Sequence, residues 1–64
     1  MDRLRGLRED KDLTQQFLGD YLGCNQTTYS RYESGEISIP VDILKKLATF
    51  YDVSIDYICG RKDY

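Results

Sequence analysis

A row of polar side chains between residues 26 and 31 has the best spacing for binding chemistry in this 64-residue chain. Four residues stand at i, i+1, i+4 and i+5, namely Gln26, Thr27, Ser30 and Arg31, and a helix over 26–33 would place them on one face. Gln can pair with an adenine edge, Arg with guanine, and a Thr methyl group can touch a thymine methyl group. A merely solvated face would be expected to carry Lys and Glu, which form helices more readily than Thr and Ser. The row therefore predicts that Gln26, Thr27 and Arg31 contact bases in duplex DNA, and a plain polar face is the alternative.

Two short helices joined by a tight turn are predicted to position this row. Thr14 is suited to cap a helix over 15–22, whose apolar stripe includes Leu18. Gly23 follows the last apolar residue, where a left-handed helix exit favours glycine. Asn25 can then cap a second helix over 26–33. One helix thus ends and another begins within about three residues, which is the pattern of a helix-turn-helix.

The sequence around these helices resembles the Cro/C1-type (Xre-like) helix-turn-helix family of bacterial and phage regulators. The residues that carry the resemblance are Leu13-Thr14-Gln15, Leu22-Gly23, Asn25, the run Ser30-Arg31-Tyr32-Glu33, and Gly35. The similarity extends over about 4–60. It implies an all-α, compact five-helix fold like that of lambda repressor, with the helix-turn-helix formed by helices 2 and 3. We expect one domain over 1–64, with helices at about 2–10, 15–22, 26–33, 41–51 and 55–59 and a frayed tail at 61–64.

A second group of polar residues is expected to contact DNA phosphates. Gln15 is predicted to be the first residue of its helix, where backbone amides suit a phosphate and a Gln side chain adds a donor. The matching residue in the family commonly plays this part. Asn25, Thr28 and Ser30 complete the expected phosphate contacts.

Arg8 has two interpretations. The family resemblance implies that it forms a structural ion pair with Glu33, tying the first helix to the recognition helix, and we favour that role over a phosphate contact. Gly19 stands where the family prefers Ala, and a small residue is expected there because helices 2 and 3 cross closely. Cys24 and Cys59 are interpreted as small buried hydrophobic residues, with a redox switch as the alternative.

Composition limits the other functions that the chain can have. It has no His and no metal- or phosphate-binding motif, so we expect no enzyme activity, no metal, no cofactor and no evident small-molecule ligand. No apolar run approaches the length of a membrane span, and the N-terminus does not resemble a signal peptide. The chain is therefore expected to be cytoplasmic and free of membranes.

Net charge is unusual for a protein that binds nucleic acid. Nine Lys and Arg residues against eleven Asp and Glu residues give a formal charge of −2, whereas DNA-binding domains are usually basic. The loop at 34–40 contains Glu36 where relatives often have Lys or Arg, so few phosphate contacts are expected there. These features keep a competing interpretation open: a helix-turn-helix scaffold for protein–protein interaction, such as an antirepressor or pairing module, with weak or no DNA binding.

The resemblance also implies a dimer. Family members usually bind pseudo-palindromic operators as dimers, with half-sites about 34 Å apart. An apolar patch of Ile37, Ile39, Tyr57 and Tyr64 is the hypothetical dimer surface. The sequence thus predicts a transcriptional regulator, most simply a repressor of bacterial or phage type, that binds double-stranded DNA as a homodimer.

Overall fold

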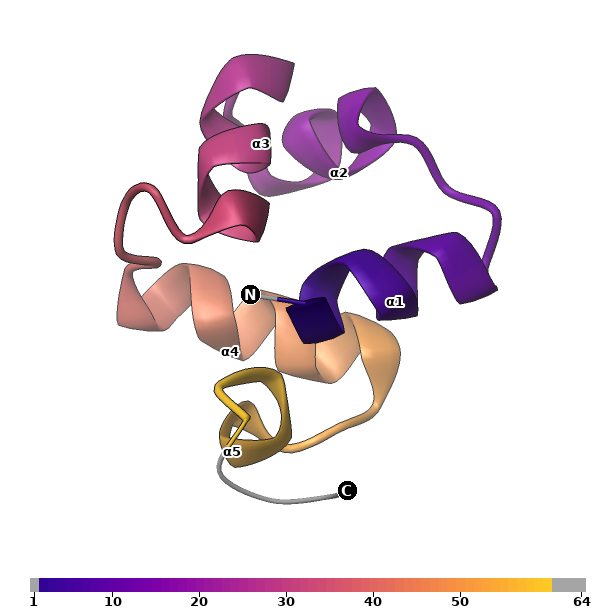
Figure 1. Cartoon of the computed structure of the whole chain (residues 1–64), viewed down its shortest axis with the longest axis vertical. Coiled ribbons are helices and arrows are strands. Elements are labelled where there is room, and N and C mark those ends of the chain that lie inside the picture. The colour runs from indigo at the N-terminus through magenta and orange to yellow at the C-terminus, as the bar shows by residue number, and fades with distance from the viewer. Residues whose placement is uncertain (1, 61–64) are drawn as a thin grey trace.

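Five helices and the turns between them make up residues 2–60, the part of the chain that the computed structural model describes (Figure 1). The helices are α1 (Asp2–Asp10), α2 (Gln15–Leu22), α3 (Gln26–Ser34), α4 (Val41–Tyr51) and α5 (Ile55–Ile58). No strand occurs within that range, so the all-α, five-helix prediction is confirmed. Helix α3 runs one residue further than expected and α5 ends one residue earlier. The tail at 61–64, with Tyr64 of the hypothetical dimer surface, lies outside the described residues.

The turn between α2 and α3 is built from the local signals in the sequence. Thr14 Oγ1 accepts a hydrogen bond from the Phe17 amide at 3.0 Å and caps α2. Gly23 ends that helix with φ 77°, a left-handed conformation that glycine adopts without steric cost. Asn25 Oδ1 then accepts the Thr28 amide at 2.7 Å and caps α3. Both helix starts are thereby satisfied by side chains, and α2 and α3 lie side by side (Figure 1).

Helix α4 begins after a proline and ends at a residue in the left-handed conformation. Pro40 lies just before the first helical residue, Val41, and supplies no side-chain hydrogen bond to cap the helix. Asp52 ends α4 in the left-handed conformation with φ 56°, which a short polar side chain tolerates better than most. Ser54 Oγ accepts the Tyr57 amide at 2.9 Å and caps α5.

The core receives residues from all five helices. Its buried apolar members are Leu4, Leu18, Leu22, Tyr29, Tyr32, Leu47, Tyr51 and Ile58. Half-buried residues, including Leu13 and Cys24, pack against this cluster. The two cysteines are free thiols and only half-buried, so the expectation of buried cysteines holds only in part.

Gly19 lies where α2 crosses the start of α3. A Cβ atom built on Gly19 would lie 3.1 Å from the Asn25 carbonyl carbon and oxygen, and 3.2 Å from the Cys24 oxygen. Such distances are shorter than an ordinary contact between a methyl group and backbone. The close approach of the two helices is therefore the physical reason for a small residue here.

Candidate nucleic-acid interface

The outer face of α3 carries the polar row found in the sequence. Gln26, Thr27 and Arg31 are exposed, whereas Thr28 and Ser30 are half-buried. A shallow hollow over this face is lined by Gln15, Gln26, Thr27, Ser30, Arg31 and Glu36. The structure thus brings the three expected base contacts together on one exposed surface, next to Gln15 and Ser30.

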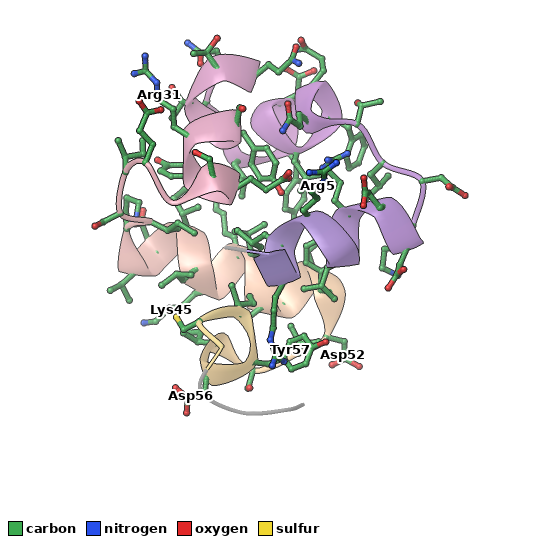
Figure 2. The ribbon with its side chains drawn as sticks, viewed as in Figure 1. Arg5, Arg31, Lys45, Asp52, Asp56 and Tyr57 are labelled. Carbon is green, nitrogen blue, oxygen red and sulfur yellow. The ribbon has the colours of Figure 1, made fainter. Side chains whose placement is uncertain are left out.

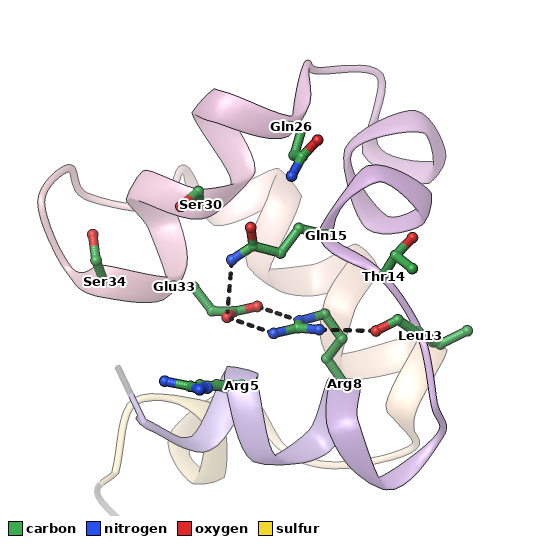
Figure 3. A pocket seen from close by; sticks show the side chains of 9 residues that line it. All are labelled: Arg5, Arg8, Leu13, Thr14, Gln15, Gln26, Ser30, Glu33 and Ser34. Atoms are coloured by element: carbon green, nitrogen blue, oxygen red, sulfur yellow. Dashed lines mark hydrogen bonds and ion pairs between the residues drawn. The ribbon is translucent and has the colours of Figure 1, made fainter.

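A larger groove separates α1 from α2 and α3 (Figure 3). Its volume is about 670 Å³, and its lining residues are Arg5, Arg8, Leu13, Thr14, Gln15, Gln26, Ser30, Glu33 and Ser34. Gln15 and Gln26 line both hollows, so the first residues of α2 and of α3 lie at the junction between them. Of the expected phosphate contacts, Gln15 and Ser30 line both hollows, whereas Asn25 and Thr28 line neither.

An ion pair closes the floor of the groove. Arg8 Nε donates to Glu33 Oε2 at 2.8 Å, and Arg8 Nη2 donates to Glu33 Oε1 at 3.2 Å. Only 13% of the Arg8 side chain and 6% of the Glu33 side chain are exposed. Arg8 Nη1 also donates to the Leu13 carbonyl at 2.9 Å, so the guanidinium holds both α3 and the turn before α2. Arg8 therefore has the structural partner that the family resemblance implied.

The same carboxylate holds a surface residue. Gln15 Nε2 donates to Glu33 Oε1 at 3.3 Å, across 18 positions of sequence, and Figure 3 shows the Gln15 carboxamide turned toward Glu33. One amide hydrogen of Gln15 is thus engaged inside the protein. Its second amide hydrogen and its oxygen have no role in this bond and can serve a ligand.

Two buried tyrosines, Tyr29 on α3 and Tyr51 on α4, have raised pKa values. Burial is the first cause that raises the pKa of Tyr29, and the negative charge of Glu33 raises it further. Burial also raises the pKa of Tyr51 to about 12. Neither hydroxyl has a hydrogen-bond partner among residues 2–60, although both oxygens are buried.

Glu33 remains ionised in this environment. Burial by itself raises the pKa of its carboxyl group. Hydrogen bonds from Arg8 and Gln15 and the positive charge of Arg8 outweigh this effect, so the pKa lies below its ordinary value. The pKa of Arg8 is raised, chiefly by its hydrogen bond to Glu33. The ion pair is therefore the stable protonation state at neutral pH.

Arg31 has a partner that the sequence did not indicate. Its Nε lies 3.4 Å from Glu36 Oε2, and both side chains are more than half exposed. Ser34 holds the loop in place, because its hydroxyl donates to the Arg31 carbonyl at 3.2 Å and accepts the Glu36 amide at 3.3 Å. Exposed pairs of this kind contribute about 0–1 kcal/mol, so a DNA base can replace Glu36 at small cost.

Comparison with known proteins agrees with this geometry. The family model described as helix-turn-helix matches residues 4–58, which include all five helices almost completely. The chain belongs to the Cro/C1-type helix-turn-helix family.

Several regulators of this helix-turn-helix family are similar to the chain. An uncharacterized HTH-type transcriptional regulator of Bacillus subtilis, YobD, is 43% identical over 95% of this chain and 54% of its own length. The cryptic phage CTXphi transcriptional repressor RstR of Vibrio cholerae is 38% identical over 94% of this chain and 54% of its own length. The transcriptional activator BcrR of Enterococcus faecalis is 36% identical over 97% of this chain and 30% of its own length.

The chain spans about half the length of the first two of these helix-turn-helix relatives. No solved structure matches it significantly. Among residues 2–60, no helix is long and apolar enough to cross a membrane. Within the same range, no cluster of three or more His, Cys, Asp or Glu side chains is placed to hold a metal ion.

The residues of the hypothetical dimer surface do not lie together. The Arg3 guanidinium stands 4.4 Å from the centre of the Tyr57 ring, beneath α1. Ile37 and Ile39 belong to the loop between α3 and α4. Figure 2 shows this loop at the left of the molecule and Tyr57 below α1. Ile37 is exposed, whereas Ile39 packs partly against the core. Tyr57 thus contacts α1, and only the loop residues share one surface.

Proposed function

We propose that this chain is a sequence-specific, double-stranded-DNA-binding transcription regulator that reads the major groove with α3. The supporting observation is the exposed face of α3, which presents Gln26, Thr27 and Arg31 together beside the first turn of α2. These three side chains have the donors, acceptors and methyl group that base edges require. Membership of the helix-turn-helix family supports the same docking of α3.

Contacts to phosphates would set the position of α3 in the groove. Gln15 has a free amide hydrogen at the N-terminus of α2, where the helix dipole favours an anion. Asn25 uses its Oδ1 atom as a cap, which leaves its amide group to donate. Thr28 and Ser30 supply hydroxyls next to the exposed row. The contacts are few, as expected for a chain with net charge −2.

Repression from a pseudo-palindromic operator is the form of regulation that we propose. The repressor RstR shares 38% identity over 94% of this chain. Two copies would then place their α3 helices in successive major grooves about 34 Å apart. The exposed Ile37 in the loop before α4 is the part of the hypothetical dimer surface that is available for such a contact.

Dimer formation can be tested by sedimentation at micromolar to millimolar concentration. Ile37→Asp should leave the helical content unchanged and weaken self-association or cooperative binding to DNA. If the unmodified chain is monomeric both free and on a two-half-site duplex, the dimer is excluded.

The DNA-binding proposal is tested by comparing the affinities of Arg31→Ala for a selected duplex and for a scrambled one. We expect this variant to lose about 1–3 kcal/mol on a selected duplex and to become tolerant at one base position. Gln15→Ala should weaken binding to selected and scrambled duplexes alike, because a phosphate carries no sequence. Gln16→Ala is its matched control, since Gln16 is exposed on α2 and bonds to Asp20 at 3.1 Å. An equal loss for Arg31→Ala on both duplexes would contradict base reading.

The net negative charge of the chain and its exposed aromatic rings favour the second candidate function, a scaffold for protein partners. Phe17 and Tyr21 are exposed on α2, and Tyr21 lies 4.8 Å from the ring of Phe50. A salt titration separates the two functions, because counterion release makes DNA binding weaken linearly with the logarithm of salt concentration. Binding to duplex DNA that is feeble and independent of sequence would favour the scaffold.

A further inference from the structure

An acidic side chain stands on the face that is proposed to meet DNA. Glu36 lines the shallow hollow over α3, together with Gln26, Thr27 and Arg31. Its side chain is 64% exposed, so burial in the core does not account for its place there. A carboxylate repels the phosphates of a duplex, and the proposed contacts with DNA give Glu36 no role. Its position beside Arg31 is therefore the feature that needs an explanation.

The turn after α3 fixes the backbone of Glu36. Gly35 ends the helix in the left-handed conformation with φ 80° and turns the chain back toward its last turn. The Glu36 amide then donates to the Arg31 carbonyl at 3.0 Å and to the Ser34 hydroxyl at 3.3 Å. The Ser34 hydroxyl donates to the same carbonyl at 3.2 Å. The backbone of Glu36 is thus held next to that of Arg31, independently of the contact between their side chains.

The contact between the two side chains engages the inner nitrogen of the guanidinium. Arg31 Nε lies 3.4 Å from Glu36 Oε2. The outer amino groups of Arg31, Nη1 and Nη2, are therefore left for a ligand. Figure 2 shows the Arg31 guanidinium at the outer edge of α3, pointing away from the ribbon. A guanine edge accepts two hydrogen bonds, at O6 and N7, so it can bind these amino groups without displacing Glu36 from Nε.

We propose that Glu36 is a positioning residue for base reading: it holds Arg31 at Nε so that Nη1 and Nη2 face a guanine in the major groove. This inference rests on the proposed function. A long side chain that is ordered before binding loses less rotamer freedom on association. The negative charge also opposes binding through phosphates alone, which weakens binding to duplexes that lack the guanine. Glu36 thus raises the ratio of specific to non-specific affinity.

A measurement without DNA tests the hold on Arg31. In Glu36→Gln, the Nε–Hε signal of Arg31 in a ¹⁵N–¹H NMR spectrum should shift, and its ¹⁵N relaxation should report faster motion. Glu9→Gln is the matched control, because Glu9 lies 3.3 Å from Arg5 Nε in an exposed pair on α1. That substitution should change the Arg5 signal and leave the Arg31 signal as it is. An Arg31 signal that responds equally to both substitutions, or to neither, would overturn the inference.

Affinities for two duplexes test the consequence. The measured quantity is the ratio between the affinity for a duplex recovered by selection from random sequences and the affinity for a scrambled one. Glu36→Gln should lower this ratio about twofold to fivefold, the size of an exposed ion pair. Glu9→Gln should change both affinities by the same factor and leave the ratio constant. A ratio that Glu36→Gln also leaves constant would overturn the positioning role while the proposed function stands.

The same substitution in the Arg31→Ala background separates positioning from direct contact. A carboxylate can itself accept a hydrogen bond from cytosine N4. If Glu36 acts through Arg31, Glu36→Gln should have no effect on the ratio in that background. A further loss of discrimination there would overturn the positioning role and assign Glu36 a base contact of its own. If the unmodified chain prefers no duplex, the proposed function and the role of Glu36 fail together, whatever the NMR result.

Discussion

Removal of Arg8 is expected to destabilise the fold strongly. Arg8→Met keeps a long apolar stem but leaves Glu33 without its charged partner. The pair is bidentate, at 2.8 and 3.2 Å, and both side chains are largely removed from solvent. Breaking a buried pair by removing one partner typically costs about 3–5 kcal/mol, because the other charge remains buried and uncompensated.

That loss is large for a domain of this size. At roughly 0.05–0.15 kcal/mol per residue, a chain of 64 residues is expected to have a total unfolding free energy of about 3–10 kcal/mol. Arg8→Met should therefore be partly unfolded at 25 °C or close to it. Urea unfolding followed by far-UV circular dichroism gives the free energy directly, and tyrosine fluorescence gives a second probe of the same transition.

Two variants serve as controls for this measurement. Arg5→Met breaks the exposed pair with Glu9, whose atoms lie 3.3 Å apart, and should change stability by no more than about 0.5 kcal/mol. The double variant Arg8→Met with Glu33→Leu replaces both charges by apolar groups and should recover most of the loss. The reasoning is refuted if Arg8→Met costs no more than Arg5→Met, or if the double variant is less stable than Arg8→Met.

Three other outcomes follow from the local geometry. Gly6→Ala should stabilise α1 by about 1 kcal/mol through helix propensity, since an added Cβ would meet nothing within 4 Å. Gly19→Ala should gain clearly less stability, because its Cβ would lie 3.1 Å from the Asn25 backbone. Equal gains of the two variants in thermal melts would contradict that close approach. Asn25→Ala should lower the free energy of unfolding by about 1 kcal/mol, because α3 loses its cap. Asn25→Asp should keep the stability and weaken DNA binding. A loss of stability in both variants would count against the capping role. The pKa of Glu33 is lowered on folding, so its stabilising contribution is complete above the ordinary value of 4.5 and is lost as the pH falls below that value. Between neutral and acid pH, Glu33→Gln should therefore lose less stability in unfolding titrations than the unmodified chain. Identical pH profiles of the two proteins would refute this.

Local signals in the sequence account for most of the fold. The caps Thr14 and Asn25 and the glycine at 23 fix where α2 ends and α3 begins, because each satisfies backbone groups or conformations within a few residues. The exposure of the row at 26–31 also follows from helical spacing alone. Its contact with DNA stays a prediction, since spacing selects a face and not its ligand.

The contacts around Glu33 could be predicted only in part. The pair with Arg8 followed from the family resemblance, whereas the bond from Gln15 joins residues 18 positions apart and depends on how α2 crosses α3. The partner of Tyr57 was missed for a similar reason: nothing local relates α5 to Arg3 at the start of the chain.

Selection from random duplex DNA tests the central claim most directly. The chain is incubated with the library at low and at moderate salt, and bound sequences are recovered over several rounds. The proposed function predicts an enriched half-site, repeated at a spacing of about one helical turn, that Arg31→Ala no longer enriches at one position. Recovery of no preferred sequence at either salt concentration would contradict DNA reading by α3.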